Sequence, residues 1–367
     1  MTLNDSGSSG DLFVAGAGLV AAVGFGVDAV SAAVRARLAW FREDDGAAGP
    51  GTRPVLATVP GIAGTGAERL AELCAPALLE SLAPLRAPAR APGAREGHAR
   101  SSGETRVHLL LAAAPADPVA GSPDPVDLAA RAASLAPELA WAPHALETRG
   151  HAAGLLAIAR ARALAAEDPE ALFLVGGACS HRDPACLARL EREGRLLSDT
   201  SPDGFVPGEA AAFCLLGTAR ALRLAGLDPM ASLGPVGAAD EPRSPGRAPS
   251  GRALAAAVRA ALPPGPAPVG AVWCDLNGDS RRSDEWAAAY LLVAPRLGPR
   301  PALWHPADRW GDIGAATGPA LIALAARELA SISGRSALVL TSSDAGERAA
   351  VAVSAVAPGA RPEKEYS

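Results

Sequence analysis

The sequence contains almost no lysine and few aromatic residues. Of its 34 lysine and arginine residues only Lys364 is a lysine, and aromatic residues make up 4% of the 367 positions. With so few aromatic side chains, alanine, leucine and valine must fill the core. The net charge of −5 and the isoelectric point near 5.8 argue against a surface that binds nucleic acid or another polyanion.

The sequence also lacks long hydrophobic runs and paired cysteines. Arg, Gly or Pro interrupts every apolar run before the ~20 residues that a membrane-spanning helix needs. Residues 1–10 are polar and rich in glycine and serine, so we expect a disordered lead and no secretory signal. The five cysteines are odd in number and widely spaced, which favours a reducing compartment over a disulfide framework. These absences predict a cytoplasmic protein without a membrane span.

Short apolar segments alternate with helical patterns along the chain, which predicts α/β layers. We expect a first half at 11–235, a linker at 236–252, a second half at 253–358 and a polar tail at 359–367. The expected strands include 12–15, 107–113, 171–175, 213–216, 271–274, 337–341 and 349–353; the expected helices include 27–41, 67–82, 152–166, 253–262 and 318–330, and 84–104 reads as a loop.

A glycine-rich segment follows the first expected strand. Residues 16–21 (GAGLVA) match the loose dinucleotide pattern G-x-G-x-x-A. Gly24 and Gly26 interrupt the helix whose N-terminus would face the phosphates, and no acidic strand end follows at the required distance. The segment therefore predicts a tight strand-to-helix turn and no nucleotide cofactor.

Five motifs follow one another in an order that is known from one family. They are 14–24 (VAGAGLVAAVG), 174–178 (LVGGA), 203–212 (DGFVPGEAAA), 277–280 (NGDS) and 311–318 (GDIGAATG). Together they resemble the motifs of the β-ketoacyl synthases of the thiolase superfamily. The resemblance implies a layered αβαβα fold of two similar halves, each a five-stranded mixed sheet, with two helices between the sheets.

The chemistry of that family depends on a cysteine thiolate at a helix N-terminus and on two histidines. The resemblance places His151 at the cysteine position, Asn277 at the first histidine position and Asp312 at the second. Ala307 stands where the family usually has a lysine, and residues 342–347 stand where it has a glycine-rich gating loop. We expect the first three residues to meet in the family's substrate pocket, and we do not expect condensation through an acyl-cysteine.

Three functions fit this pattern. The first is a non-condensing partner subunit, similar to a chain-length factor. The resemblance implies that such a subunit forms a homodimer or a heterodimer with an active synthase and contacts an acyl-carrier protein. The second is an acyltransferase or thioester hydrolase in which His151 and Asp312 activate a hydroxyl or water. The third is a non-enzymatic adaptor in another system, such as a secretion cluster. We favour the first function, and thus expect no enzymatic activity. The alternative to the second function is a relic pocket without a catalytic role, in which His151 caps its helix and Asp312 is solvated or pairs with Arg309.

One further cluster contains potential metal ligands. Cys179, His181, Asp183 and Cys186 lie close together in the sequence, but their spacing matches no familiar zinc pattern. In the family this segment is a surface connection. We therefore expect no metal and no cofactor.

Overall fold

The computed structural model describes residues 11–44, 54–86, 105–114, 125–242, 249–263, 269–330 and 335–356. One large mixed sheet has the strand order β11-β10-β12-β13-β9-β1-β8-β7-β5-β6, with β2 beside β1. Its strands are β1 (Leu12–Ala21), β2 (Gly24–Phe25), β5 (Arg106–Ala112), β6 (Ala140–Glu147), β7 (Leu172–Ser180), β8 (Glu209–Thr218), β9 (Ala231–Asp240), β10 (Ala271–Cys274), β11 (Ala302–Trp304), β12 (Ser336–Ser342) and β13 (Glu347–Ala355). A separate small pair joins β3 (Arg42–Glu43) to β4 (Val55–Leu56).

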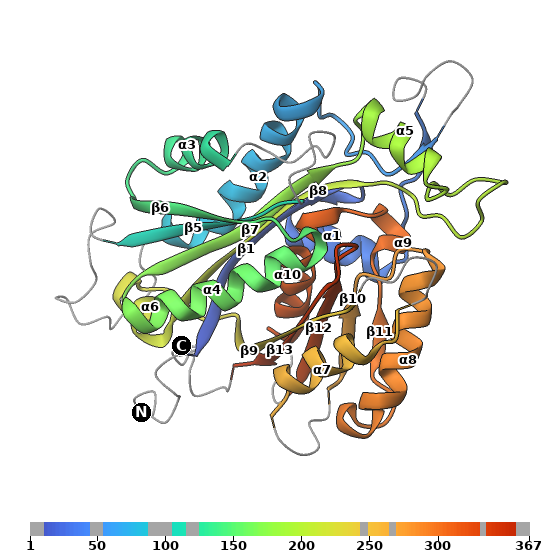
Figure 1. Ribbon diagram of the computed structural model, residues 1–367. Helices are drawn as coiled ribbons and strands as arrows, with labels where there is room; N and C mark the ends of the chain where they lie inside the picture. Colours follow the sequence, from blue (N-terminus) through green and yellow to red (C-terminus); the bar gives the residue numbers. More distant parts are fainter. Residues whose placement is uncertain are drawn as a thin grey trace.

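Helices cover the two outer faces of this folded sheet and fill the space between its N-terminal and C-terminal strands (Figure 1). The helices are α1 (Val27–Arg35), α2 (Gly66–Arg86), α3 (Pro125–Leu135), α4 (Ala153–Glu167), α5 (Pro184–Arg192), α6 (Ala219–Ala225), α7 (Arg252–Ala261), α8 (Ser280–Leu297), α9 (Ala307–Trp310) and α10 (Thr317–Leu329). None of the described helices is long and apolar enough to cross a membrane.

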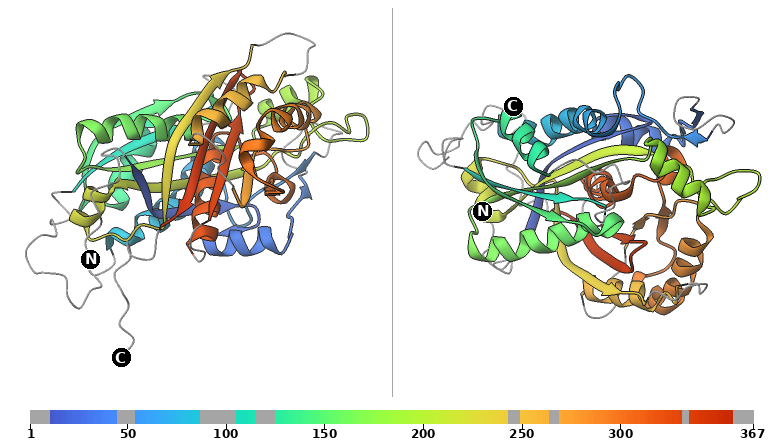
Figure 2. Two further views of the ribbon diagram at one scale, coloured as in Figure 1. Left: turned by 90° about the horizontal axis from the view of Figure 1, so that it is seen from below. Right: turned by 45° about the horizontal axis from the view of Figure 1, so that its top comes forward.

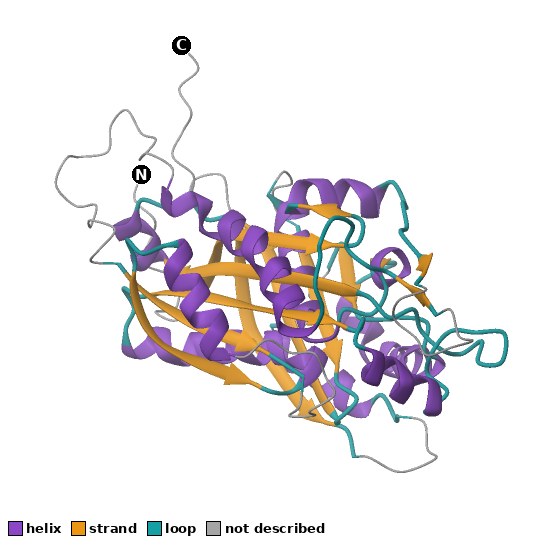
Figure 3. Ribbon diagram, turned by 90° about the horizontal axis from the view of Figure 1, so that it is seen from above, coloured by secondary structure: helices purple, strands orange, loops and turns teal. Residues whose placement is uncertain are grey.

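The main strands of this continuous sheet form two sets of five, which face each other across two central helices. The N-terminal set is β1, β8, β7, β5 and β6, and the C-terminal set is β9, β13, β12, β10 and β11. Helices α2 and α3 pack on the outer face of the N-terminal set, α7 and α8 on that of the C-terminal set, and α4 and α10 lie between them in the largest core cluster. Figures 2 and 3 show the strands between these helical layers. The layers have the expected αβαβα order.

The two sets join through a short seam between β1 and β9. The antiparallel pairing runs from Leu12 opposite Leu233 to Val14 opposite Ala231. Strand β9 continues to Asp240, into the segment 236–252 that we expected to be a linker. The division of the chain into a first and a second half at this segment remains a prediction.

The glycine-rich segment lies inside β1, so the turn that we predicted at residues 16–21 is wrong. A Cβ atom on Gly16 would lie 2.3 Å from the carbonyl oxygen of Ser81, and one on Gly18 would lie 1.9 Å from that of Ala77. These glycines let the backbone of α2 rest directly on the strand, which is a packing role. The turn comes later, where Ala21 pairs with Gly24.

Several boundaries also differ from the sequence prediction. Helix α1 ends at Arg35 and not near residue 41, because Arg37 adopts a left-handed φ of 57°. Helix α2 continues to Arg86, into the expected loop at 84–104, while residues 87–104 lie outside the described part. The lead at 1–10 and the tail at 359–367 also lie outside it. Helices α3 and α5 and strands β6 and β9 were not anticipated.

Candidate functional site

His151 lies in a short 3₁₀ turn, Gly150–Ala152, that leads into α4. The backbone N–H of Ala152 donates to the Ser343 hydroxyl at 3.2 Å, which joins this turn to the loop after β12. The His151 side chain is 11% exposed. Its Nε2 atom lies 2.9 Å from each carboxylate oxygen of Asp312. The turn therefore aims the imidazole inward, at a charge from the other end of the chain.

Asp312 is held in place by contact between two of the sequence motifs. Its N–H donates to the carbonyl of Val206, and its carbonyl accepts from the N–H of Gly208, both at 2.8 Å. Gly311 has a φ of 74°, and a Cβ atom there would lie 2.6 Å from the Val206 oxygen. The glycines of both motifs are thus required for close backbone contact, and this contact orients the Asp312 carboxylate.

The Asp312 carboxylate is saturated with donors. Asn277 Nδ2 donates to Oδ2 at 2.6 Å, and the N–H of Gly314 donates to Oδ1 at 2.9 Å. The Nε2 atom of His181 lies 3.3 Å from Oδ1. Burial alone raises the pKa of Asp312, but the charges and hydrogen bonds of His151 and His181 outweigh it and hold the pKa well below its ordinary value. Asp312 is therefore a buried anion.

The structure brings the three predicted residues together at this carboxylate. His151 and Asn277 both contact Asp312, as the resemblance implied, although their chemical role remains a prediction. The alternative in which Asp312 pairs with Arg309 is wrong, because Arg309 pairs with Asp308 at 3.0 Å. The α4 N-terminus has no side-chain cap, so His151 does not cap its helix either.

From the sequence, we considered His181 only as a potential metal ligand and did not place it at this site. It follows β7 directly, in the segment that we expected to be a surface connection, yet its side chain is only 17% exposed. Burial lowers the pKa of His181, but Cys179, Asp312 and Cys186 raise it well above its ordinary value. Its place just after a glycine-rich strand end was the available signal.

The prediction also missed Arg282, in the first turn of α8. Its side chain is 6% exposed, and its Nη1 atom donates to Asp275 and to the carbonyl of Ser342. Its Nη2 atom lies 3.3 Å from His151 Nδ1 and 3.2 Å from Asp344 Oδ1. Burial lowers the pKa of Arg282, but Asp275 and Asp344 raise it above its ordinary value, so the guanidinium stays charged.

Arg282 also covers the His151 ring. Its Nη2 atom lies close to both ring nitrogens, 3.3 Å from Nδ1 and 3.5 Å from Nε2. The imidazole is therefore enclosed between the Asp312 carboxylate and the Arg282 guanidinium.

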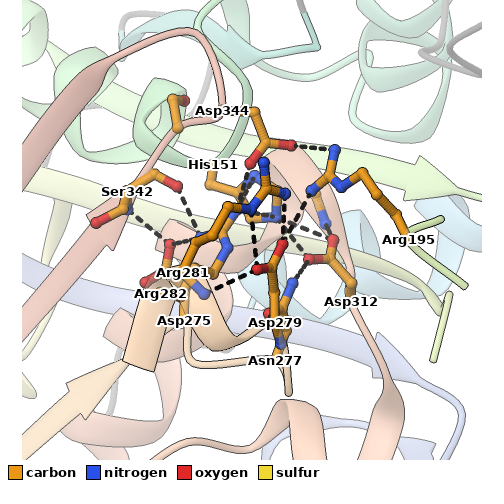
Figure 4. A network of polar contacts seen from close by, with 12 residues as sticks. His151, Arg195, Asp275, Asn277, Asp279, Arg281, Arg282, Asp312, Ser342 and Asp344 are labelled. Carbon is orange, nitrogen blue, oxygen red and sulfur yellow. Dashed lines mark hydrogen bonds and ion pairs between the residues drawn. The ribbon is translucent and has the colours of Figure 1, made fainter. Parts of the chain in front are cut away.

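Arg282 separates two cavities of very different size. The inner cavity has a volume of about 10 Å³ and is lined by His151, Asn277, Asp312 and apolar side chains such as Trp310. That volume accommodates about one water molecule. On the other side of Arg282, a cleft of about 610 Å³ is lined by charged residues of both signs. Figure 4 shows the polar network between them, in which Asp344 bridges Arg195 and Arg282.

Comparison with known proteins shows a likeness of fold. No protein-family model matches the sequence, and no curated protein matches it. Within the described residues, no group of three or more His, Cys, Asp or Glu side chains could hold a metal ion.

Among solved structures, a ketosynthase from module 6 of the bacillaene synthase of Bacillus subtilis 168 superposes with a TM-score of 0.74 at 13% identity, over 95% of this chain and 72% of its own. The ishigamide ketosynthase/chain length factor gives 0.64 at 23% identity, over 95% and 100%. A type II polyketide ketosynthase in complex with its acyl-carrier protein gives 0.69 at 15% identity, over 94% and 99%. The chain has the thiolase-like fold of the ketosynthases.

Proposed function

We propose that this chain is a non-condensing, ketosynthase-like subunit of an acyl-carrier-dependent system of the polyketide or fatty-acid type. It acts as the partner of an active synthase, much as a chain-length factor does. The fold supports this proposal, since one of the similar structures is a ketosynthase/chain length factor. The observation that carries it is the imidazole of His151, which stands at the position expected for the nucleophile and is enclosed between the Asp312 carboxylate and the Arg282 guanidinium.

The electrostatics of the site are unsuited to condensation. Condensation requires a nucleophile to take the acyl group and donors to stabilise the negative oxygen that develops on the thioester carbonyl. Asp312 supplies a buried negative charge at the second histidine's expected position, which repels such an oxyanion and the malonyl carboxylate. Replacing a donor with an anion therefore removes the stabilisation and adds a penalty.

The space at the site leads to the same conclusion. The inner cavity of about 10 Å³ has no room for an acyl group. The cleft of about 610 Å³ is large enough for a ligand, but the Arg282 side chain and its partners separate it from His151. An acyl chain would have to displace a buried, charged arginine to reach the imidazole.

The partnership is supported by the exposed edge of the sheet. Strand β6 is eight residues long, and among the described strands it pairs only with β5. Such an edge invites another strand, so we assign it to the interface with a second ketosynthase-like chain. Leu146 of β6 is 39% exposed and supplies apolar surface to that interface.

A second candidate is thioester hydrolysis or acyl transfer by His151. The distance of 2.9 Å between its Nε2 and Asp312 favours it, because a carboxylate commonly orients a catalytic imidazole. The candidate requires Arg282 to move away from the ring, because its guanidinium lies within 3.5 Å of both ring nitrogens and blocks the approach of a substrate. The experiment that tests the proposal also distinguishes this alternative.

The test is incubation with acyl- and malonyl-carrier protein, followed by intact-mass measurement and by assays for released carrier and for decarboxylation. We expect no covalent adduct and no turnover, while a cysteine-containing ketosynthase assayed in parallel gives both. Turnover that is lost in His151→Ala would establish the hydrolase or transferase and contradict the proposal.

Co-expression with a cysteine-containing ketosynthase tests the partnership directly. We expect a one-to-one complex that Leu146→Lys weakens at least tenfold. Leu291→Lys is the matched control, because Leu291 lies in α8, away from the β6 edge, and is 79% exposed. Equal effects of the two variants, or no complex at all, would overturn the assignment of the β6 edge.

A further inference from the structure

Two thiols of the cluster that the sequence offered as potential metal ligands, Cys179 and Cys186, flank the imidazole of His181. Cys186 Sγ lies 3.6 Å from Nδ1, and Cys179 Sγ lies 3.6 Å from Nε2. Nε2 also faces Asp312 Oδ1 at 3.3 Å. Cys186, His181 and Asp312 therefore form a continuous thiol–imidazole–carboxylate chain in which Cys186 and Asp312 face different ring nitrogens.

This arrangement favours transfer of the thiol proton of Cys186 to the ring. With the Nε2 proton directed at Asp312, Nδ1 is the nitrogen that can accept a proton from the Cys186 thiol. The buried Asp312 carboxylate then stabilises the imidazolium that forms. A thiolate and an imidazolium in contact replace a neutral thiol and a neutral ring.

The position of Cys186 in α5 adds to the effect. Cys186 lies in the first turn of this nine-residue helix, where Asp183 caps the backbone N–H groups of Ala185 and Cys186. The positive end of the helix and Arg189 Nη2, at 4.0 Å, both favour a negative sulfur. Burial raises the pKa of Cys186, but His181 and Arg189 lower it below its ordinary value overall.

The other buried cysteines provide an internal contrast. Burial raises the pKa of both Cys74 and Cys214 to about 12, and it also raises the pKa of Cys274. In the described part of the chain, no hydrogen bond joins any of these three thiols to a histidine. Protonated thiols of this kind are poor nucleophiles.

We propose that Cys186 is a thiolate that reacts with hydrogen peroxide, an oxidant small enough to reach a residue that is 1% exposed. The sulfur attacks one peroxide oxygen, an S–O bond forms and the O–O bond breaks. The sulfur is oxidised by two electrons to sulfenic acid, and the departing hydroxide takes the Nδ1 proton of His181 to leave as water. His181 becomes neutral, so Asp312 loses a cationic partner, and oxidation at α5 alters the charge beside His151.

The test exposes the folded protein to dilute hydrogen peroxide, quenches with catalase, unfolds the chain in the presence of a sulfenic-acid trap and maps all five cysteines by peptide mass. We expect Cys186 to be oxidised at least tenfold faster than Cys74, Cys214 and Cys274. Its rate should change less than threefold between pH 6.5 and pH 8.5. A free thiol with a pKa of about 8.5 would react about fiftyfold faster at the higher pH.

Two variants separate the thiol pair. His181→Asn should slow oxidation of Cys186 at least tenfold, whereas Cys179→Ser should leave it within twofold. If His181→Asn unfolds, all five thiols will react together, and the wild-type pH comparison then decides. Equal oxidation of all cysteines in the folded protein, preferential oxidation of Cys179, or a steep rise of the rate with pH would overturn the proposal.

Discussion

Two buried carboxylates, Glu209 at the start of β8 and Asp312 just after α9, have very different partners. Glu209 accepts from Arg69 Nε at 2.7 Å, from the N–H of Val59 at 2.6 Å and from the Ser180 hydroxyl at 2.8 Å. The partners of Asp312 include two imidazoles, His151 and His181. The two segments are joined by a backbone hydrogen bond, in which the N–H of Gly208 donates to the carbonyl of Asp312.

The difference lies in which partners can lose their charge. A guanidinium remains positive at any physiological pH, so Glu209 and Arg69 form a permanent anchor between α2 and β8. An imidazole, in contrast, can lose its charge: the raised pKa of His181 keeps the ring cationic to a higher pH than usual, but its proton can still be lost to the chemistry of its neighbours. The comparison separates a carboxylate that holds the fold together from one on which a function can depend.

The largest expected effect comes from removing the charge partner of Glu209. Arg69→Met leaves a carboxylate that is 0% exposed without its cation, and we expect a loss of about 3–5 kcal/mol in the free energy of unfolding. Urea denaturation measures it. Arg106→Met is the control, because Arg106 is 62% exposed in its pair with Asp168 and should change stability by less than about 1 kcal/mol. Similar effects of the two variants would show that Glu209 is not an anchor.

A smaller and pH-dependent effect is expected at the other carboxylate. Asp312→Asn should cost about 1–3 kcal/mol at pH 5, because charge-assisted hydrogen bonds to both imidazoles are weakened. A lowered carboxyl pKa contributes stability above its unfolded value of about 3.9, and that contribution is lost as the pH falls through the folded value. The difference in the free energy of unfolding between wild type and variant should therefore be smaller below pH 3.9 than at pH 5. Urea denaturation of both proteins at pH 5 and below pH 3.9 measures it. A difference that grows in acid would contradict this assignment.

The smallest effect is expected at the rim of the cleft. Asp344 is 49% exposed and bridges Arg195 at 2.8 Å and Arg282 at 3.2 Å. Asp344→Asn should change the free energy of unfolding by less than about 1 kcal/mol, and the change should decrease in high salt. A loss as large as that of Arg69→Met would mean that this exposed carboxylate belongs with the anchors.

The order of the layers could be predicted from the sequence, whereas some local details could not. The apolar segments near 107–113 and 271–274 gave correct strands, because buried strands are continuous aliphatic runs. The glycines of β1 looked like a turn, because the sequence does not show that carbonyls of α2 occupy the space where side chains would be. Strand β6 was missed because its edge position leaves it half exposed and without an apolar pattern.

The candidate site was predictable only as far as the motifs extend. His151, Asn277 and Asp312 were found through the resemblance and meet as expected. The contacts of His181 with Asp312 and of Arg282 with His151 each span 131 residues of sequence, and neither is part of a periodic pattern. Such contacts arise from tertiary packing, so only the folded arrangement reveals them.

The close approach of α2 to β1 has a consequence for how sequences with this fold diverge. Any sequence that keeps α2 in this position must retain glycine at positions 16 and 18, whatever reaction the protein carries out, because a side chain would meet backbone oxygens at 2.3 Å and 1.9 Å. The side chains of His151, Asn277 and Asp312 carry no such steric requirement of the layers, so they can change while the layers keep their packing. Glycines of this kind therefore record the history of a fold more durably than the polar residues that line its site.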